Sequence, residues 1–166
     1  MKTLTLVRHA KSSWKDTSLT DRERPLNKRG KRDAPEMGRR ISAAGIRPSL
    51  IVSSPAVRAW TTATTIARVI GYPLEFLQRE KALYLASVDD ILDVIVVQDP
   101  KFNSLMLVGH NPGFTSFANY LVPGLTNNLP TAGIVSVQID QDNWDLYGRP
   151  EAELVLHDFP KNRPEQ

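Results

Sequence analysis

The sequence predicts an α/β protein, a three-layer α/β/α sandwich with a mainly parallel central sheet. Short apolar segments of strand length alternate with longer segments of helical composition along most of the chain. The 166 residues are enough for one domain with a buried core, and no repeat or linker divides them. We therefore expect a single domain over residues 1–159, followed by a loose, Pro-containing tail over residues 160–166.

Six apolar segments are the expected strands. They cover residues 4–7, 50–52, 74–77, 105–108, 134–139 and 154–156. The last two are expected to close the sheet, in antiparallel orientation. The expected helices cover residues 27–44, 55–70, 88–97 and 113–121. Ser54 and Ser87 are suitable N-caps, and Pro55 suits a first helical position.

Composition excludes several classes of function. The chain has no Cys, which rules out disulfides, thiolate catalysis and Cys-ligated metal sites. The apolar N-terminal run is interrupted at Arg8-His9, too early for a signal segment, and no run approaches the ~18 apolar residues of a membrane span. We expect a cytoplasmic protein without a membrane partner, and a monomer.

Charge is unevenly distributed. Residues 1–58 carry a net charge of +9 and the remainder −6, which indicates an anionic ligand near the N-terminal half. Solvated helix faces are the simpler interpretation for many of these basic side chains. Nucleic acid is a weaker candidate, because the chain has no RNP, GXXG or zinc-finger motif.

Three of the expected strands are followed by groups suited to phosphate. The first leads into Arg8 and His9, the second leads through Ser54 to Arg58, and the fourth leads into His110. In open parallel sheets the ligand crevice lies beyond the carboxyl ends of the strands, so these side chains can meet at one place.

Phosphoryl chemistry explains these residue types. Arg provides permanently charged forks that bind two oxygens of a dianion at once. Without Cys or metal ligands, a neutral imidazole is the best available nucleophile, and flanking Arg charges would keep His9 unprotonated. His110, if protonated, would donate to a phosphoryl oxygen. A metal site built on His9 and His110 is the competing interpretation, weakened by the adjacent Arg8 and the lack of a close carboxylate. We interpret His157 as structural or exposed.

Four segments carry a family resemblance. They are Leu6-Val7-Arg8-His9-Ala10-Lys11-Ser12, Arg24-Pro25-Leu26-Asn27-Lys28-Arg29-Gly30, Ser53-Ser54-Pro55-Ala56-Val57-Arg58-Ala59 with Thr62-Ala63, and Val108-Gly109-His110. In this order the chain resembles the histidine phosphatase superfamily, also called phosphoglycerate mutase-like. Within that superfamily it is most similar to the small SixA-type phosphohistidine phosphatases, which lack large cap insertions.

The resemblance implies roles for particular residues. His9 is the implied nucleophile, and Arg8, Arg58 and His110 complete the implied phosphate pocket, without a metal or an organic cofactor. Ser12 and Lys15 stand where the mutase branch has Thr and Asn, which makes them candidates for substrate binding.

The general acid is an open question. In many relatives the general acid is a Glu after the third strand. If that position corresponds to Glu80, then Glu80 is the acid; if it lies nearer to residues 83–85, the acid is missing. Acid phosphatases have an Asp after the second His, and here Asn111 stands in that place.

The expected function is therefore a phosphatase that acts through phospho-His9 on a phosphorylated protein or a small phosphorylated molecule. Phosphohistidine on a protein is favoured over a small-molecule phosphomonoester. A non-catalytic phospho-ligand binding module is the rival of a different class.

Overall fold

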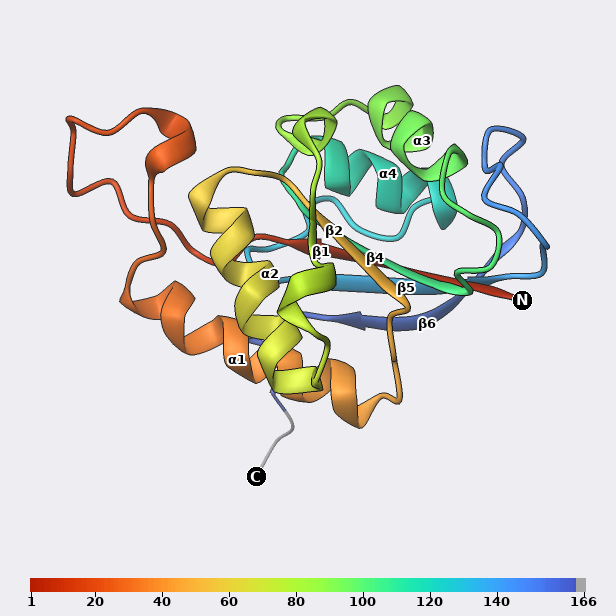
Figure 1. Cartoon of the computed structure of the whole chain (residues 1–166), viewed down its shortest axis with the longest axis horizontal. Helices are drawn as coiled ribbons and strands as arrows, with labels where there is room; N and C mark the ends of the chain where they lie inside the picture. Colours follow the sequence, from red (N-terminus) through yellow and green to blue (C-terminus); the bar gives the residue numbers. More distant parts are fainter. Residues whose placement is uncertain (164–166) are drawn as a thin grey trace.

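The computed structural model describes residues 1–163, in which helices cover both faces of a six-stranded sheet (Figure 1). The strand order is β3-β2-β4-β1-β5-β6. The strands are β1 (Lys2–Arg8), β2 (Leu50–Ser53), β3 (Gln78–Arg79), β4 (Ser104–Gly109), β5 (Ile134–Ile139) and β6 (Ala152–Asp158). The first four pair in parallel, β5 runs antiparallel to β1, and β6 runs antiparallel to β5. The predicted three-layer fold and its antiparallel closing strands are confirmed.

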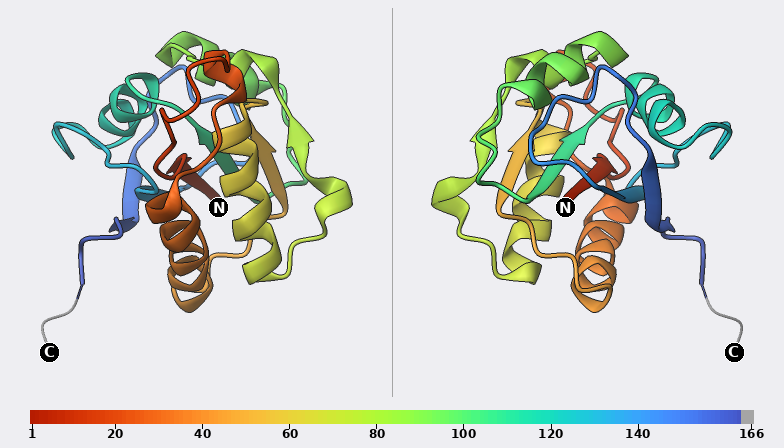
Figure 2. Two further views of the ribbon diagram at one scale, coloured as in Figure 1. Left: turned by 90° about the vertical axis from the view of Figure 1, so that its left-hand side faces the viewer. Right: turned by 90° about the vertical axis from the view of Figure 1, so that its right-hand side faces the viewer.

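The helices pack in pairs on the two faces of the sheet, and both views of Figure 2 show helices on either side of it. The first pair is α1 (Lys28–Ala43) and α2 (Val57–Ile70), and the second is α3 (Val88–Val96) and α4 (Gly113–Leu121). Alternate residues of β4 supply the two cores, because successive side chains of a strand point to opposite faces. Leu105 and Leu107 belong to the core under α3 and α4, whereas Met106 and Val108 belong to the core under α1 and α2.

Local capping explains where two of the helices begin. The Asn27 side chain accepts a hydrogen bond from the Gly30 N–H at 2.9 Å, so α1 starts one residue after it. Ser87 and Asp90 form a reciprocal capping box at the start of α3, which confirms Ser87 as its N-cap. Gly30 also lets α1 approach the chain that follows β1, since a Cβ at this position would lie 2.2 Å from the Lys11 carbonyl oxygen.

The predicted strand over residues 74–77 is wrong. Leu74–Phe76 forms a 3-10 turn, in which the Phe76 N–H donates to the Pro73 carbonyl at 3.1 Å. Leu74 and Phe76 are exposed, so their apolar character does not indicate burial in the sheet. The chain reaches the sheet only at β3, whose two residues pair with the end of β2.

The predicted cap of the second helix is also wrong. The first residue of α2 is Val57, so Pro55 lies before the helix, and the Ser54 hydroxyl accepts from the Ala56 N–H at 3.3 Å. The same hydroxyl lies 2.7 Å from Nε2 of His110, which gives Ser54 a role in the site instead. Arg58 nevertheless lies in the first turn of α2, as predicted.

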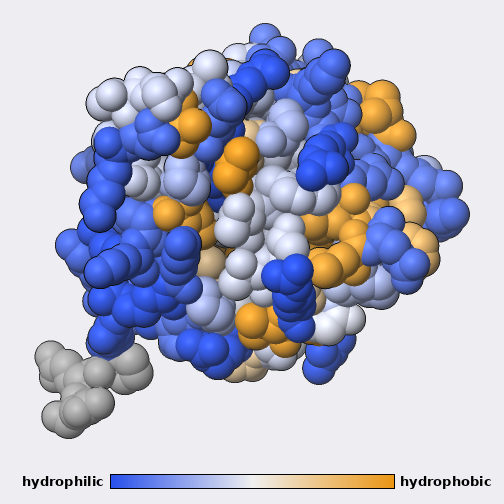
Figure 3. Space-filling model, turned by 60° about the vertical axis from the view of Figure 1, so that its left-hand side comes forward, coloured by the Kyte–Doolittle hydropathy of each residue, from blue (hydrophilic) through white to orange (hydrophobic). Residues whose placement is uncertain are grey.

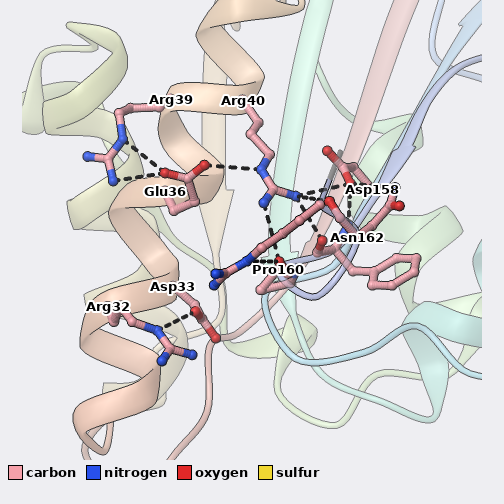
Figure 4. Close-up of polar contacts among 10 residues, drawn as sticks. Arg32, Asp33, Glu36, Arg39, Arg40, Asp158, Pro160 and Asn162 are labelled. Carbon is pink, nitrogen blue, oxygen red and sulfur yellow. Dashed lines mark hydrogen bonds and ion pairs between the residues drawn. The ribbon is translucent and has the colours of Figure 1, made fainter. Parts of the chain in front are cut away.

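The chain after β6 returns to α1 (Figure 4). Arg40 pairs with Asp158 at 3.2 Å and donates to three backbone carbonyl groups within residues 159–162, at 2.9–3.2 Å. The segment expected to be a loose tail therefore begins with an anchored turn, and residues 164–166 lie outside the described part of the chain. No helix within residues 1–163 has the length and apolar character needed to cross a membrane.

Candidate active site

The site lies at the carboxyl end of the parallel strands, on the left in Figure 1. Hydrogen bonding between strands continues one residue beyond β1 and β2. The His9 N–H donates to the Gly109 carbonyl at 3.0 Å, and the Ser54 N–H donates to the Val108 carbonyl at 2.9 Å. This register brings the rings of His9 and His110 together, with their centroids 5.1 Å apart.

A cavity of about 370 Å³ opens at this end. Five of the residues predicted for the site line it, namely Arg8, His9, Ser12, Arg58 and His110. Two others do not reach it. Lys15 is exposed, and Glu80 caps a separate 3-10 turn, where its carboxylate accepts from the Ala82 N–H at 3.1 Å.

The backbone around His9 is held from three sides. Besides the bond from the His9 N–H, its carbonyl oxygen accepts from the Ala132 N–H at 3.0 Å. The next residue, Ala10, donates its N–H to the Thr62 hydroxyl at 2.9 Å, and that hydroxyl donates to the Arg58 carbonyl at 2.8 Å. Thr62 thus couples the chain after β1 to the helix that carries Arg58, and the position of His9 is fixed before any ligand arrives.

The surroundings of the His9 imidazole suit a nucleophile. Its side chain is buried, and Nδ1 lies 2.8 Å from the Ala10 carbonyl oxygen. Because a carbonyl oxygen only accepts, Nδ1 carries the proton and Nε2 keeps its lone pair. The pKa of His9 is lowered to about 4, mainly by burial and also by the charges of Arg58 and Arg8, which together outweigh the raising effect of the hydrogen bond to Ala10. The ring is therefore neutral at pH 7, as a nucleophilic imidazole must be.

His110 is neutral as well. Burial is the largest cause that lowers its pKa, to about 3, and the neighbouring His9 and Arg58 lower it further. Its Nε2 lies 2.7 Å from the Ser54 hydroxyl. A phosphoryl dianion beside the ring would favour the protonated form, so His110 can become a charged donor only as the anion binds.

Three side chains at the cavity have a buried nitrogen without a partner. Within residues 1–163, Arg8 Nε, Arg58 Nε and His110 Nδ1 have no hydrogen-bond partner. Native proteins rarely leave such groups unpaired, and the oxygens of a phosphoryl group are the acceptors that the two guanidinium N–H groups lack. The arrangement is that of a preformed anion site.

A carboxylate that the sequence analysis missed lies in the same cavity. Asp21 belongs to a 3-10 turn, Asp21–Glu23, in the segment between β1 and α1. Its side chain accepts from Arg58 at 2.9 Å and from Arg24 at 3.2 Å, and the Tyr84 hydroxyl donates to it. The Tyr84 hydrogen bond is the largest cause that lowers the pKa of Asp21, to about 2, so this carboxylate is ionised at neutral pH. Asp21 therefore orients the two arginines, and its single negative charge offsets one of their two positive charges.

Asn111 lies at the cavity wall in place of an acid. Its amide nitrogen donates to the Leu129 carbonyl at 3.0 Å, and its amide oxygen accepts from the Thr115 N–H at 3.1 Å. The side chain is committed to fixing the loop before β5. No three His, Cys, Asp or Glu side chains of residues 1–163 are grouped so that they could hold a metal ion.

The structure thus gathers histidines and arginines at the strand ends of a three-layer α/β sandwich, an arrangement suited to a phosphoryl group. Comparison with known proteins agrees. Residues 4–81 match the model of the histidine phosphatase superfamily, branch 1. An uncharacterized chloroplastic protein of Arabidopsis thaliana is 33% identical over 150 residues, which cover 86% of this chain and 68% of that protein.

Solved structures give the same result. A protein of Agrobacterium tumefaciens, named as a phosphohistidine phosphatase SixA, superposes with a TM-score of 0.81 at 27% identity, over 96% of this chain and 98% of that chain. The protein histidine phosphatase SixA in complex with tungstate has the same fold, with a TM-score of 0.80 at 18% identity over 96% and 98% of the two chains. The chain belongs to the histidine phosphatase superfamily, in its SixA-type branch, and is a phosphatase.

Proposed function

We propose that the protein removes the phosphoryl group from phosphohistidine on a protein, with His9 as the nucleophile. The observation that carries this proposal is the state of Asp21. Among residues 1–163 it is the one carboxylate that lines the cavity, and its low pKa and its bonds to Arg58 and Tyr84 keep it ionised. The ligand-free site therefore holds Asp21 as a carboxylate near pH 7, without a proton to donate.

The missing acid restricts the leaving groups. An alkoxide from serine or a sugar needs a proton as it departs, and a positioned acid is typically worth ~10²–10⁴ in rate. Phosphohistidine needs no such help when the second nitrogen of its ring is protonated, because the departing imidazole is then neutral. The names of the SixA relatives agree with this substrate, and the lack of a carboxylate at Asn111 favours it in the same way.

The geometry supports a two-step transfer. The phosphoryl oxygens bind to Arg8, Arg58 and His110, and Nε2 of His9 attacks phosphorus while the bond to the substrate nitrogen breaks. Water then attacks phosphorus as the P–Nε2 bond breaks, and inorganic phosphate leaves as H2PO4−, which exchanges its proton with the solvent. His9 returns to its starting form, with Nδ1 still donating to the Ala10 carbonyl.

A small phosphorylated molecule is the second candidate, handled by the same mechanism. The observation that favours it is the volume of the cavity, about 370 Å³, which lies in the range of sites for small ligands. Aryl phosphates would suit such a site, since a phenolate also leaves without an acid.

The test is a set of substrates with graded leaving groups. We expect comparable kcat/KM values for phosphohistidine and for aryl phosphates, and values lower by at least ~10² for alkyl phosphates such as phosphoserine. Equal values for alkyl and aryl phosphates would refute the argument from the missing acid. Tight binding of inorganic phosphate without turnover of any ester or phosphoramidate would favour the binding module.

A further inference from the structure

The mouth of the cavity carries two apolar side chains that the phosphoryl chemistry does not use. Trp14 and Leu85 both line the cavity, yet they are 71% and 56% exposed. They come from different parts of the chain, the segment after β1 and the segment before α3. Figure 3 brings forward the side of the molecule on which the segment after β1 lies, and apolar residues there form small, separate areas in a hydrophilic surface.

Trp14 is fixed although it is exposed. The guanidinium carbon of Arg24 lies 3.5 Å from the centroid of the indole ring, so one face of the ring covers this cation. Arg24 is itself buried and is held by Ser12 at 2.8 Å and by Asp21 at 3.2 Å. Arg24 therefore holds the indole in place at the cavity while most of its surface stays exposed.

Leu85 occupies a backbone conformation that disfavours it. Its φ is 49°, in the left-handed region where glycine is free and a branched side chain is strained. Its neighbours Leu83 and Ala86 are buried and tie the segment down on both sides. A strained residue with an exposed apolar side chain, at the edge of an active site, is typical of a group retained for contact with a ligand.

We propose that Trp14 and Leu85 form a subsite for the leaving group, which binds the flat imidazole ring of phosphohistidine while the phosphoryl group enters the charged floor. This inference rests on the function proposed above. Charged groups deep in the cavity and apolar faces at its mouth complement a substrate that is a dianion at one end and a ring at the other. The subsite selects substrates that carry a ring over those that offer the same P–N bond without one.

The test uses two substrates with the same bond to phosphorus. Free phosphohistidine carries the ring, and the phosphoramidate ion does not. For Trp14→Ala and Leu85→Gly we expect the ratio of kcat/KM for phosphohistidine to kcat/KM for phosphoramidate to fall about tenfold, mainly through KM for phosphohistidine. Trp14→Phe keeps a flat ring and should restore most of the ratio.

Two further measurements separate contact with the ring from structural damage. Leu85→Gly removes the side chain and also relieves the backbone, so its Tm should equal or exceed that of the wild type while the ratio falls. Phe76→Ala is the matched control, because Phe76 is an exposed aromatic residue away from the cavity, and its ratio should stay at the wild-type value.

The outcomes distinguish the two proposals. Wild-type protein that hydrolyses neither substrate would overturn the proposed function. Wild-type protein that hydrolyses both, with the ratio unchanged in Trp14→Ala and Leu85→Gly, would overturn the subsite alone.

Discussion

Strand β1 carries a cationic side chain at each end, and the two differ in how many of their N–H donors have a hydrogen-bond acceptor. Lys2, at the start of the strand, is 2% exposed. Its ammonium donates to the Pro100 carbonyl, to the Phe102 carbonyl at 3.3 Å and to Oδ1 of Asn103 at 2.9 Å. An ammonium has three N–H groups, so each has an acceptor. This buried charge is fully satisfied within the protein.

Arg8, at the other end of the same strand, is not satisfied. Its guanidinium has five N–H donors, and within residues 1–163 the Leu129 carbonyl, at 3.0 Å, is the acceptor it finds. Burial lowers the pKa of Arg8. The contrast teaches that a satisfied buried cation supports the fold, whereas an incompletely satisfied one beside a cavity prepares a place for an anionic ligand.

Removal of the incompletely paired cation should produce the largest effect. For Arg8→Met we expect kcat/KM for an aryl phosphate to fall by ~10²–10³, the usual cost of losing one preorganised donor to a transition-state oxygen. The free energy of unfolding should stay the same or rise, since a costly buried charge is gone. Steady-state kinetics and denaturant unfolding check both expectations. A kcat/KM within threefold of the wild type would contradict the claim that Arg8, unlike Lys2, prepares a place for an anionic ligand.

His9 and His110, which lie beside Arg8, should make the free energy of unfolding depend on pH. The pKa values of His9, about 4, and His110, about 3, lie below the ~6.5 of an unfolded chain, so the unfolded state binds more protons between these values. Stability contributed by the neutral rings is complete above pH ~6.5 and is lost as the pH falls toward the folded-state pKa values, about 4 for His9 and about 3 for His110.

NMR titration of the imidazole C–H signals measures these pKa values directly, with His9→Gln and His110→Gln to assign them. Inorganic phosphate should raise both pKa values, because an anion favours the protonated ring. Titration of either ring near 6.5 in the free protein would contradict the account.

Lys2 should show the opposite pattern to Arg8. In Lys2→Met the apolar stem is kept, but three hydrogen bonds from the buried ammonium are lost, so the free energy of unfolding should fall by about 1–3 kcal/mol. The kcat/KM of the folded protein should remain within twofold of the wild type, because the site lies at the far end of the sheet. A selective loss of activity without a loss of stability would contradict the structural role.

The smallest effect is expected at Glu80. Its carboxylate caps a 3-10 turn outside the cavity, so Glu80→Gln should lower stability by no more than about 1 kcal/mol. The dependence of kcat/KM on the pKa of the leaving group should match that of the wild type. A dependence that is flat in the wild type and steep in the variant would identify Glu80 as the acid and remove the reason for preferring phosphohistidine.

The deepest part of the site, formed by Arg8, His9, Arg58 and His110, could be predicted from the sequence because the order of strands in the sheet determines it. Arg8, His9 and His110 follow apolar strands, and parallel strands bring their carboxyl ends to one edge. Arg58 follows the next strand along the edge, so its convergence with them also came from the order of elements. The same reasoning could not place Ser54, whose hydroxyl bonds to His110 rather than capping α2.

The outer part of the site, around Asp21, Tyr84 and Leu85, could not be predicted, because it depends on contacts between loops. Tyr84 meets Asp21 across 63 positions of the sequence, and no periodic pattern indicates such a contact. The signal that was available is local: Thr20 and Glu23 form a capping box, which marks a turn at Asp21. Leu85 gave no signal, because a left-handed backbone is recognisable in a sequence mainly where glycine or asparagine provides it.

The central claim is that Nε2 of His9 receives the phosphoryl group. The most direct measurement is to quench the reaction with alkali, in which phosphohistidine survives, and to identify the modified atom by peptide mapping and NMR. Because Nδ1 donates its hydrogen to the Ala10 carbonyl, we predict phosphate on Nε2 of His9 in the wild type and no phosphorylated residue in His9→Gln. Phosphate on Nδ1 or on another residue, or full turnover by His9→Gln, would contradict the account.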